Sequence, residues 1–256
     1  MPFEYVSVDD AMKRRGLRMV VVGGVPSPWG EAAKGILHIK SIDWVAVRLL
    51  YDSEPLKEWA GQRNGPVAIL DDERPRAGWA EILLLAERLA PALSLLPKDP
   101  AERALVFGLA HEICGEDGLG WARRLQLVQA GLDNAGGFPA RVATYLAKKY
   151  GYSPESGAAA CARVVELLGM LAARLKAQRQ AGSRYYVGNA LSAVDVYSAT
   201  FTALFGPLPS EQCAMDTSSR AAFETLDAPT VAALDPILFE HRDMMYRERL
   251  ELPLAL

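Results

Sequence analysis

Hydrophobic and polar positions divide the chain into two parts with different periodicities. Between residues 17 and 90, short apolar runs alternate with segments of helical spacing, whereas nearly everything after residue 97 has helical spacing. In the first part the pattern predicts strands over residues 17–22, 44–47 and 66–70, helices over 8–15, 29–40, 56–60 and 79–89, and a turn with a short edge strand over 71–76.

The second part follows a boundary over residues 93–100, which contains Pro97 and Pro100. Its helical spacing covers residues 100–113, 117–132, 138–150, 156–180, 192–205 and 236–249. Residues 206–235 contain several prolines and little periodicity, so we expect a loop with short turns there. Ser192 and Asp195 have capping-box spacing, which we interpret as structural. The sequence therefore predicts an α/β domain over 1–92, with a short extension over 1–16, and an all-α domain over 98–256.

Composition and charge exclude several classes of protein. The chain has 28 Lys and Arg against 31 Asp and Glu, and this charge balance argues against nucleic acid or an anionic membrane as a partner. Its cysteines, Cys114, Cys161 and Cys213, are too few and too scattered for a disulfide framework or a cysteine zinc site. The apolar run over residues 19–25 is too short to span a membrane, and no cleavage site follows it. We therefore expect a cytoplasmic protein that holds no metal.

Three short motifs resemble the cytosolic glutathione transferase superfamily. A Ser-Pro-Trp sequence at residues 27–29 lies between the first predicted strand and the helix after it, where serine-type members place the residue that activates the thiol. Residues 65–67, Gly-Pro-Val, are similar to the family's cis-proline step, and residues 187–195 are similar to its Gly-Asp-x-x-Ser/Thr-x-Ala-Asp signature. The resemblance covers about residues 17–205, and it implies a thioredoxin-like α/β domain followed by an all-α domain.

The resemblance also implies a glutathione site and names its residues. Ser27 is the implied catalytic residue, and the implied glutathione-binding residues are Pro28, Trp29, Gly65, Pro66, Val67, Gly78 and Trp79. One departure lies in the last pair, because the family usually has an acidic residue and a serine there to hold the γ-glutamyl end of glutathione. Arg74 and Arg76 either bind a glutathione carboxylate in their place or belong to a solvated loop.

Ser27 precedes a predicted helix, and this position suits the stabilisation of an anion. A free thiol has a pKa of about 8.5, so glutathione must be held as its thiolate to react at neutral pH. The Ser27 hydroxyl can donate to that sulfur, while the unpaired N–H groups at the helix start favour the negative charge. The alternative is that Ser27 is only a capping or turn residue.

The other implied residues also have two interpretations each. A cis Pro66 would turn the main chain of Gly65 toward an extended peptide ligand, whereas a trans Pro66 would simply open an edge strand. Trp29 and Trp79 either form apolar walls for an electrophile or pack in the core. From their positions along the chain alone, we expect three further residues to line the hydrophobic site, namely Phe107, His111 and Tyr246.

These observations lead to a functional hypothesis and two alternatives. We expect a glutathione transferase-like enzyme of detoxification that joins glutathione, as co-substrate, to a small hydrophobic electrophile. From the family we expect a homodimer, with helices 79–90 and 100–113 as contact surfaces. The first alternative is a non-catalytic protein of the same fold that binds ligands or proteins, because Gly78–Trp79 replaces the acid–serine pair. A thiol–disulfide oxidoreductase is poorly supported, since residues 1–113 contain no cysteine.

Overall fold

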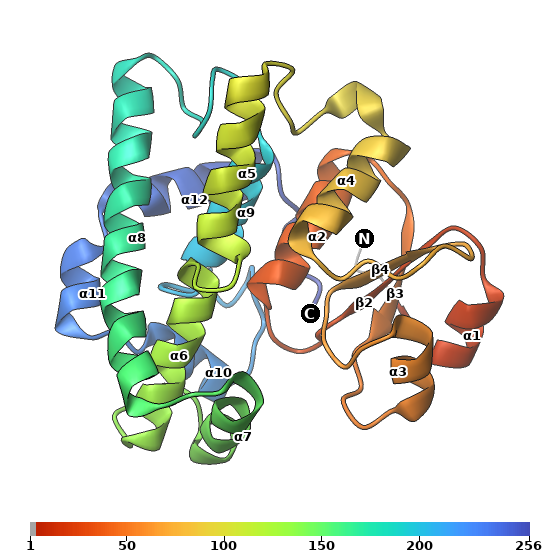
Figure 1. Cartoon of the computed structure of the whole chain (residues 1–256), viewed down its shortest axis with the longest axis horizontal. Coiled ribbons are helices and arrows are strands. Elements are labelled where there is room, and N and C mark those ends of the chain that lie inside the picture. Colours follow the sequence, from red (N-terminus) through yellow and green to blue (C-terminus); the bar gives the residue numbers. More distant parts are fainter. Residues whose placement is uncertain (1–3) are drawn as a thin grey trace.

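The computed structural model describes residues 4–256, and its N-terminal part is built on a four-stranded sheet (Figure 1). The strands lie in the order β1–β3–β2–β4, and their bounds are β1 Tyr5–Val6, β2 Leu17–Val21, β3 Trp44–Arg48 and β4 Val67–Leu70. Strand β3 is parallel to β1 and β2, whereas β4 is antiparallel to β2. The edge strand predicted over residues 71–76 is reduced to a bridge between Ala68 and Arg76.

Helices cover both faces of this sheet because apolar side chains point alternately to one face and the other along each strand. Met19 and Val21 face the larger core, and Val20 between them faces a second core. The larger core lies under α2 (Pro28–Ile39) and α4 (Trp79–Leu89), which contact each other. The second core lies under α1 (Val8–Lys13) and α3 (Glu54–Ala60) on the opposite face (Figure 1). Strand β1 was not predicted, and residues 1–3 of the predicted extension lie outside the described residues.

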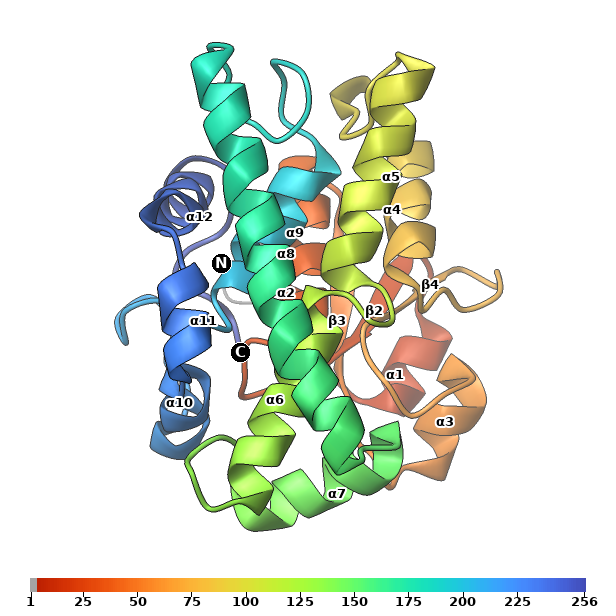
Figure 2. The same cartoon turned by 60° about the vertical axis from the view of Figure 1, so that its left-hand side comes forward.

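The C-terminal part is all helical and packs around one fully buried helix. After a short 3₁₀ turn over Pro91–Leu93, its longer helices are α5 (Pro100–Cys114), α6 (Leu119–Leu132), α7 (Ala140–Tyr150), α8 (Pro154–Gln180), α9 (Ala193–Thr202) and α12 (Pro236–Glu248). Every residue of α9 is buried, and this helix contacts α2, α5 and α12. Figure 2 shows α9 behind the long α8, between α12 and α5. Helix α9 therefore joins the two parts of the molecule.

The prediction of a loop over residues 206–235 was wrong in two places. Helix α10 spans Thr217–Glu224 and helix α11 spans Ala228–Ala233. Each begins at an aspartate, Asp216 or Asp227, whose carboxylate accepts hydrogen bonds from the first N–H groups of the helix. The sequence signal for both helices is therefore the capping aspartate, since neither segment has an extended apolar periodicity.

Candidate functional site

A cleft of about 580 Å³ lies between the sheet-containing part and the helical part. The loops that follow β2 and β3, the turn before β4 and the start of α4 form one side, and α5, α6 and α7 form the other. All of the residues that the resemblance implied line this cleft except Val67. The Val67 side chain is fully buried in the second core, so it contributes to the sheet and not to the cleft wall.

Ser27 occupies the N-cap position of α2 at the cleft wall. Its backbone is extended, with φ −62° and ψ 118°, and its carbonyl accepts the first helical hydrogen bond from Glu31 N at 2.8 Å. The Ser27 side chain makes no capping hydrogen bond. Pro28 has no N–H, so Trp29 and Gly30 supply the free amides of the first turn. The hydroxyl is therefore available to a ligand in the cleft, and the helix start beside it favours an anion.

The turn before β4 has the backbone that the resemblance implied. The Gly65–Pro66 peptide bond is cis. A Cβ atom on Gly65 would lie 3.3 Å from the carbonyl oxygen of Val20, so glycine allows this turn to approach β2 closely. Gln62 and Asn64 bring two amide side chains to the cleft from the same turn, and the sequence analysis did not single them out.

The start of α4 shows what replaces the family's acid–serine pair. The Glu81 carboxylate turns back to accept hydrogen bonds from Gly78 N at 3.2 Å and Ala77 N at 3.3 Å. Arg74 donates to the same carboxylate at 2.8 Å and, together with the Gly78 amide, lowers the pKa of Glu81 below its ordinary value. The Glu81 carboxylate therefore already occupies the amides at the start of α4. A ligand carboxylate has less access to these amides than it would have beside the acid–serine pair of the family.

Both of the arginines beside α4 are engaged by carboxylates of the chain itself. Arg76 pairs with Glu73, which also accepts two hydrogen bonds from Arg88 at 2.7 Å. The Arg88 and Arg76 guanidinium groups lower the pKa of Glu73. Of the two interpretations of Arg74 and Arg76, the structure favours the one in which they belong to a surface ion-pair loop.

Trp29 and Trp79 line the cleft and also pack between the two parts of the molecule. The Trp29 ring nitrogen donates to the Cys114 carbonyl at 2.8 Å, and its ring meets Phe201 edge-on with a centroid separation of 4.9 Å. The main-chain carbonyl of Trp79 accepts from the Tyr197 hydroxyl at 3.2 Å, and the two rings are 5.6 Å apart. Both tryptophans therefore pack between the two parts of the molecule and also line the cleft, and their contact with an electrophile stays a prediction.

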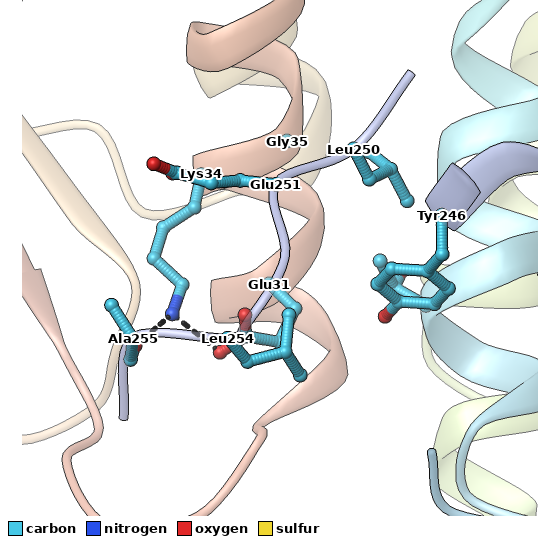
Figure 3. A pocket seen from close by; sticks show the side chains of 9 residues that line it. Glu31, Lys34, Gly35, Tyr246, Leu250, Glu251, Leu254 and Ala255 are labelled. Atoms are coloured by element: carbon cyan, nitrogen blue, oxygen red, sulfur yellow. Dashed lines mark hydrogen bonds and ion pairs between the residues drawn. The ribbon is translucent and has the colours of Figure 1, made fainter. Parts of the chain in front are cut away.

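Of the three residues placed by segment position, one lines the cleft. His111 lies at its wall, whereas the Phe107 ring packs 6.2 Å from Trp79 and is not part of the lining. Tyr246 was wrongly placed, since it is buried on α12 and faces a different, much smaller pocket (Figure 3).

That smaller pocket lies where the chain after α12 crosses α2 (Figure 3). Its free volume is only about 20 Å³. Burial raises the pKa of Glu31, against the effect of Lys34, whose ammonium group lies 2.6 Å from the carboxylate and 2.7 Å from the Ala255 carbonyl. Leu250 packs so closely that a Cβ atom on Gly35 would lie 2.6 Å from it. The pocket is therefore a packing contact between the tail and α2.

The cleft also contains residues that the sequence analysis missed. Arg124 on α6 lies beside Trp121, Tyr150 and Trp29, and Tyr51 enters the cleft from the loop after β3. Trp121 and Arg124 are three apart on a predicted helix, so a shared face was foreseeable. Nothing in the periodicity shows that this face points into a cleft.

Two structural features are absent from residues 4–256. In this described part of the chain, no group of three His, Cys, Asp or Glu side chains is arranged to hold a metal ion. None of its helices combines the length and the apolar character that crossing a bilayer requires.

Comparison with known proteins identifies the fold. No protein-family model and no curated protein matches the sequence, whereas many solved structures match the fold. A glutathione S-transferase from Methylobacterium radiotolerans, crystallised with glutathione sulfonate, is 20% identical with a TM-score of 0.62, and the match covers 91% of each chain. Rice GST1, crystallised with glutathione, is 19% identical over 94% of each chain, with a TM-score of 0.60.

A third match is the nitrogen regulation fragment of the yeast prion protein Ure2p. It is 12% identical with a TM-score of 0.58, and the match covers 91% of this chain and 93% of that one. A thioredoxin-like α/β domain followed by an all-α domain, with a cleft between them, defines the class of protein. The chain has the fold of the glutathione transferase superfamily, which confirms the predicted fold class.

Proposed function

We propose that the protein binds glutathione in this cleft and holds its thiolate for attack on a small hydrophobic electrophile. The observation that carries the proposal is the Ser27 hydroxyl, which lies at the start of α2, makes no capping bond and lines a cleft of about 580 Å³. Structures of the same fold that were crystallised with glutathione or its sulfonate support the choice of ligand.

In the proposed reaction, the partial positive charge at the start of α2 is enough to stabilise the glutathione thiolate, and no charged side chain is needed. The Ser27 hydroxyl and the first amides of α2 donate hydrogen bonds to the glutathione sulfur, which favours its ionised form. The thiolate attacks an electrophilic carbon, a carbon–sulfur bond forms, and the leaving group departs with its electron pair. Ser27 stabilises the anion and forms no covalent bond itself.

Main-chain groups and amides are proposed to hold the rest of the tripeptide. The cis turn at Gly65–Pro66 presents its main chain to the cleft, and Gln62 and Asn64 add amide donors and acceptors beside it. Because Glu81 fills the start of α4, we expect weaker glutathione binding than an acid–serine pair would give.

Replacing Ser27 by alanine is expected to lower kcat/KM for conjugation of glutathione to 1-chloro-2,4-dinitrobenzene by about three- to tenfold, because one donor to the thiolate is lost. The melting temperature should stay nearly unchanged, since the hydroxyl caps no helix. Ser53→Ala is the matched control. Ser53 does cap its helix, accepting from Leu56 N at 3.2 Å, so this variant should lose about 1 kcal/mol of stability and keep its activity. Full activity in Ser27→Ala would remove Ser27 from the mechanism.

The second candidate function is ligand or protein binding without turnover. The occupation of the α4 start by Glu81 favours it, and a fragment of the regulatory protein Ure2p has the same fold. Retention on a glutathione column together with turnover of a chloroaromatic supports the enzyme. Retention or passage without any turnover supports the binding protein.

We further propose a cytoplasmic homodimer that forms through α4 and α5. Leu84 and Leu89 on α4 and Leu105 on α5 are 44%, 38% and 38% exposed, so both helices carry apolar side chains that a second copy would cover. Light scattering should give about twice the 27.8 kDa chain mass, and Leu84→Glu should give a monomer. Leu132→Glu, a similarly exposed leucine at the end of α6, should remain dimeric. A wild-type monomer would contradict the proposal.

A further inference from the structure

Arg124 lies in the cleft among three aromatic rings. Its guanidinium carbon is 4.3 Å from the ring centre of Tyr150, 4.5 Å from that of Trp29 and 5.3 Å from that of Trp121. These rings come from α7, α2 and α6, so both parts of the molecule form the surroundings of this cation. Aromatic faces attract a cation without using its N–H groups.

In the described part of the chain, the donors of Arg124 have no acceptor. Across residues 4–256, the structure contains neither a hydrogen bond nor an ion pair of the Arg124 side chain, although its guanidinium carries five N–H groups. Burial lowers the pKa of Arg124, while the nearby Tyr150 and Tyr51 partly oppose this shift. The Arg124 nitrogens are not sealed from solvent, so an anionic ligand that enters the cleft can accept hydrogen bonds from them.

The neighbouring Arg123 shows the contrast. Its side chain points into the core and donates hydrogen bonds to Gln126 and to the main-chain carbonyls of Leu204, Phe223 and Thr225. Within residues 4–256, the protein thus supplies acceptors for four hydrogen bonds of Arg123 and for none of Arg124. This difference leaves the hydrogen-bond donors of Arg124 available to a ligand in the cleft.

We propose that Arg124 binds an anionic group, such as a carboxylate, of an aromatic second substrate and thereby selects acidic electrophiles. The identity of the reaction rests on the proposed function, whereas the binding of the anion does not. Trp29, Trp121 and Tyr150 stack against the planar body of this substrate, and Tyr51, which also lines the cleft, offers a further hydroxyl donor.

The position of Arg124 favours the second substrate over the glutathione carboxylates. The proposed contacts of the tripeptide lie on the sheet-containing part, at Gly65 and the amides beside it. Arg124 instead projects from α6 over Trp29, two residues after Ser27. An anion bound by Arg124 therefore lies at the helical wall of the cleft and not at the turn that is proposed to hold the tripeptide.

The reaction leaves the recognised anion unchanged. With a chloronitrobenzoate, the thiolate forms a carbon–sulfur bond at the carbon that bears chlorine, and chloride leaves with the bonding electron pair. The carboxylate stays on the ring and keeps its hydrogen bonds to Arg124. Arg124 is thus a specificity-determining residue in this proposal, and Ser27 remains the group that stabilises the thiolate.

The test compares two ligands that differ only in the carboxylate, 4-chloro-3-nitrobenzoate and 1-chloro-2-nitrobenzene. Isothermal titration without glutathione should show that Arg124→Met weakens binding of the benzoate about tenfold or more and changes binding of the neutral compound less than about twofold. The matched control is Arg103→Met. Arg103 lies 5.3 Å from the Phe107 ring but outside the cleft lining, so this variant should bind both compounds as the wild type does.

The other outcomes would overturn the inference, and each has a distinct meaning. Equal weakening of both compounds would mean that Arg124 only supports the aromatic wall, and no change in either would remove it from the site. If Arg124→Met instead weakened binding of glutathione and not of the benzoate, the cation would serve the tripeptide. Failure of the proposed function looks different: the wild type would bind the benzoate through Arg124 yet conjugate glutathione to neither compound.

Discussion

Replacing Asp195 by alanine is expected to lower the free energy of unfolding by about 3 to 5 kcal/mol. The Asp195 carboxylate is completely buried at the start of α9 and accepts four hydrogen bonds. Their donors are Tyr186 N at 2.9 Å, Ser192 N and the Ser192 hydroxyl at 2.8 Å, and His241 Nε2 at 3.0 Å. Alanine would leave all of these groups unpaired in the helix that joins the two parts of the molecule.

Urea unfolding followed by circular dichroism measures this loss, and Asp99→Ala is the matched control. Asp99 also caps a helix, accepting from Ala101 N and Glu102 N, but it lies on the surface. Its replacement should cost about 1 kcal/mol. Similar losses in the two variants would mean that Asp195 acts only as a helix cap and that its burial adds nothing.

The contacts of Asp195 also show how far the sequence predicts the structure. The capping box with Ser192 is visible in the sequence because its partners are three residues apart, and the structure contains it. The bond to His241 joins residues 46 apart, and no local pattern specifies it. Periodicity and capping therefore predicted most helices and strands. The contacts between distant residues that fix their arrangement could not be predicted from these local patterns.

Helices α10 and α11 were missed for a different reason. They have eight and six residues, which is too few turns for an apolar periodicity to stand out. A usable signal was nevertheless present, because Asp227 with Pro229 repeats the combination of a capping aspartate and an early proline that opens α5 and α12. Weighting such caps above periodicity would have predicted α11.

The residues of the candidate site also fall into two groups, those that a short motif predicts and those that only contacts between distant segments place in the cleft. Ser27 and the cis Pro66 lie in short motifs, so the resemblance placed both at the cleft wall. The replacement of the family's acid at Gly78 was visible, but the return of Glu81 to that helix start depends on side-chain geometry. The exposure of Arg124 to the cleft depends on how α6 packs against α2, which no spacing along the chain records.

Replacing Arg123 by methionine is expected to lower the free energy of unfolding by about 3 to 5 kcal/mol, although methionine keeps much of the side-chain volume. Arg123 is 1% exposed, and burial lowers its pKa to about 10, so it stays charged at neutral pH. Its guanidinium donates hydrogen bonds to the main-chain carbonyls of Leu204, Phe223 and Thr225. These carbonyls follow α9 and end α10, so we expect the segment over residues 206–235 to exchange amide hydrogens and to be cleaved by proteases faster than in the wild type.

Arg124→Met is the matched control for this prediction, because the two arginines are adjacent on α6 and differ in their partners. It removes contacts with aromatic rings but no hydrogen bond within residues 4–256, so its cost should be about 1 kcal/mol or less. If the two variants lost equal stability, the hydrogen bonds of Arg123 would contribute no more than the stacking of Arg124. If Arg123→Met alone loosened residues 206–235, one buried cation would hold the two short helices in place, and its neighbour would be free to serve the cleft.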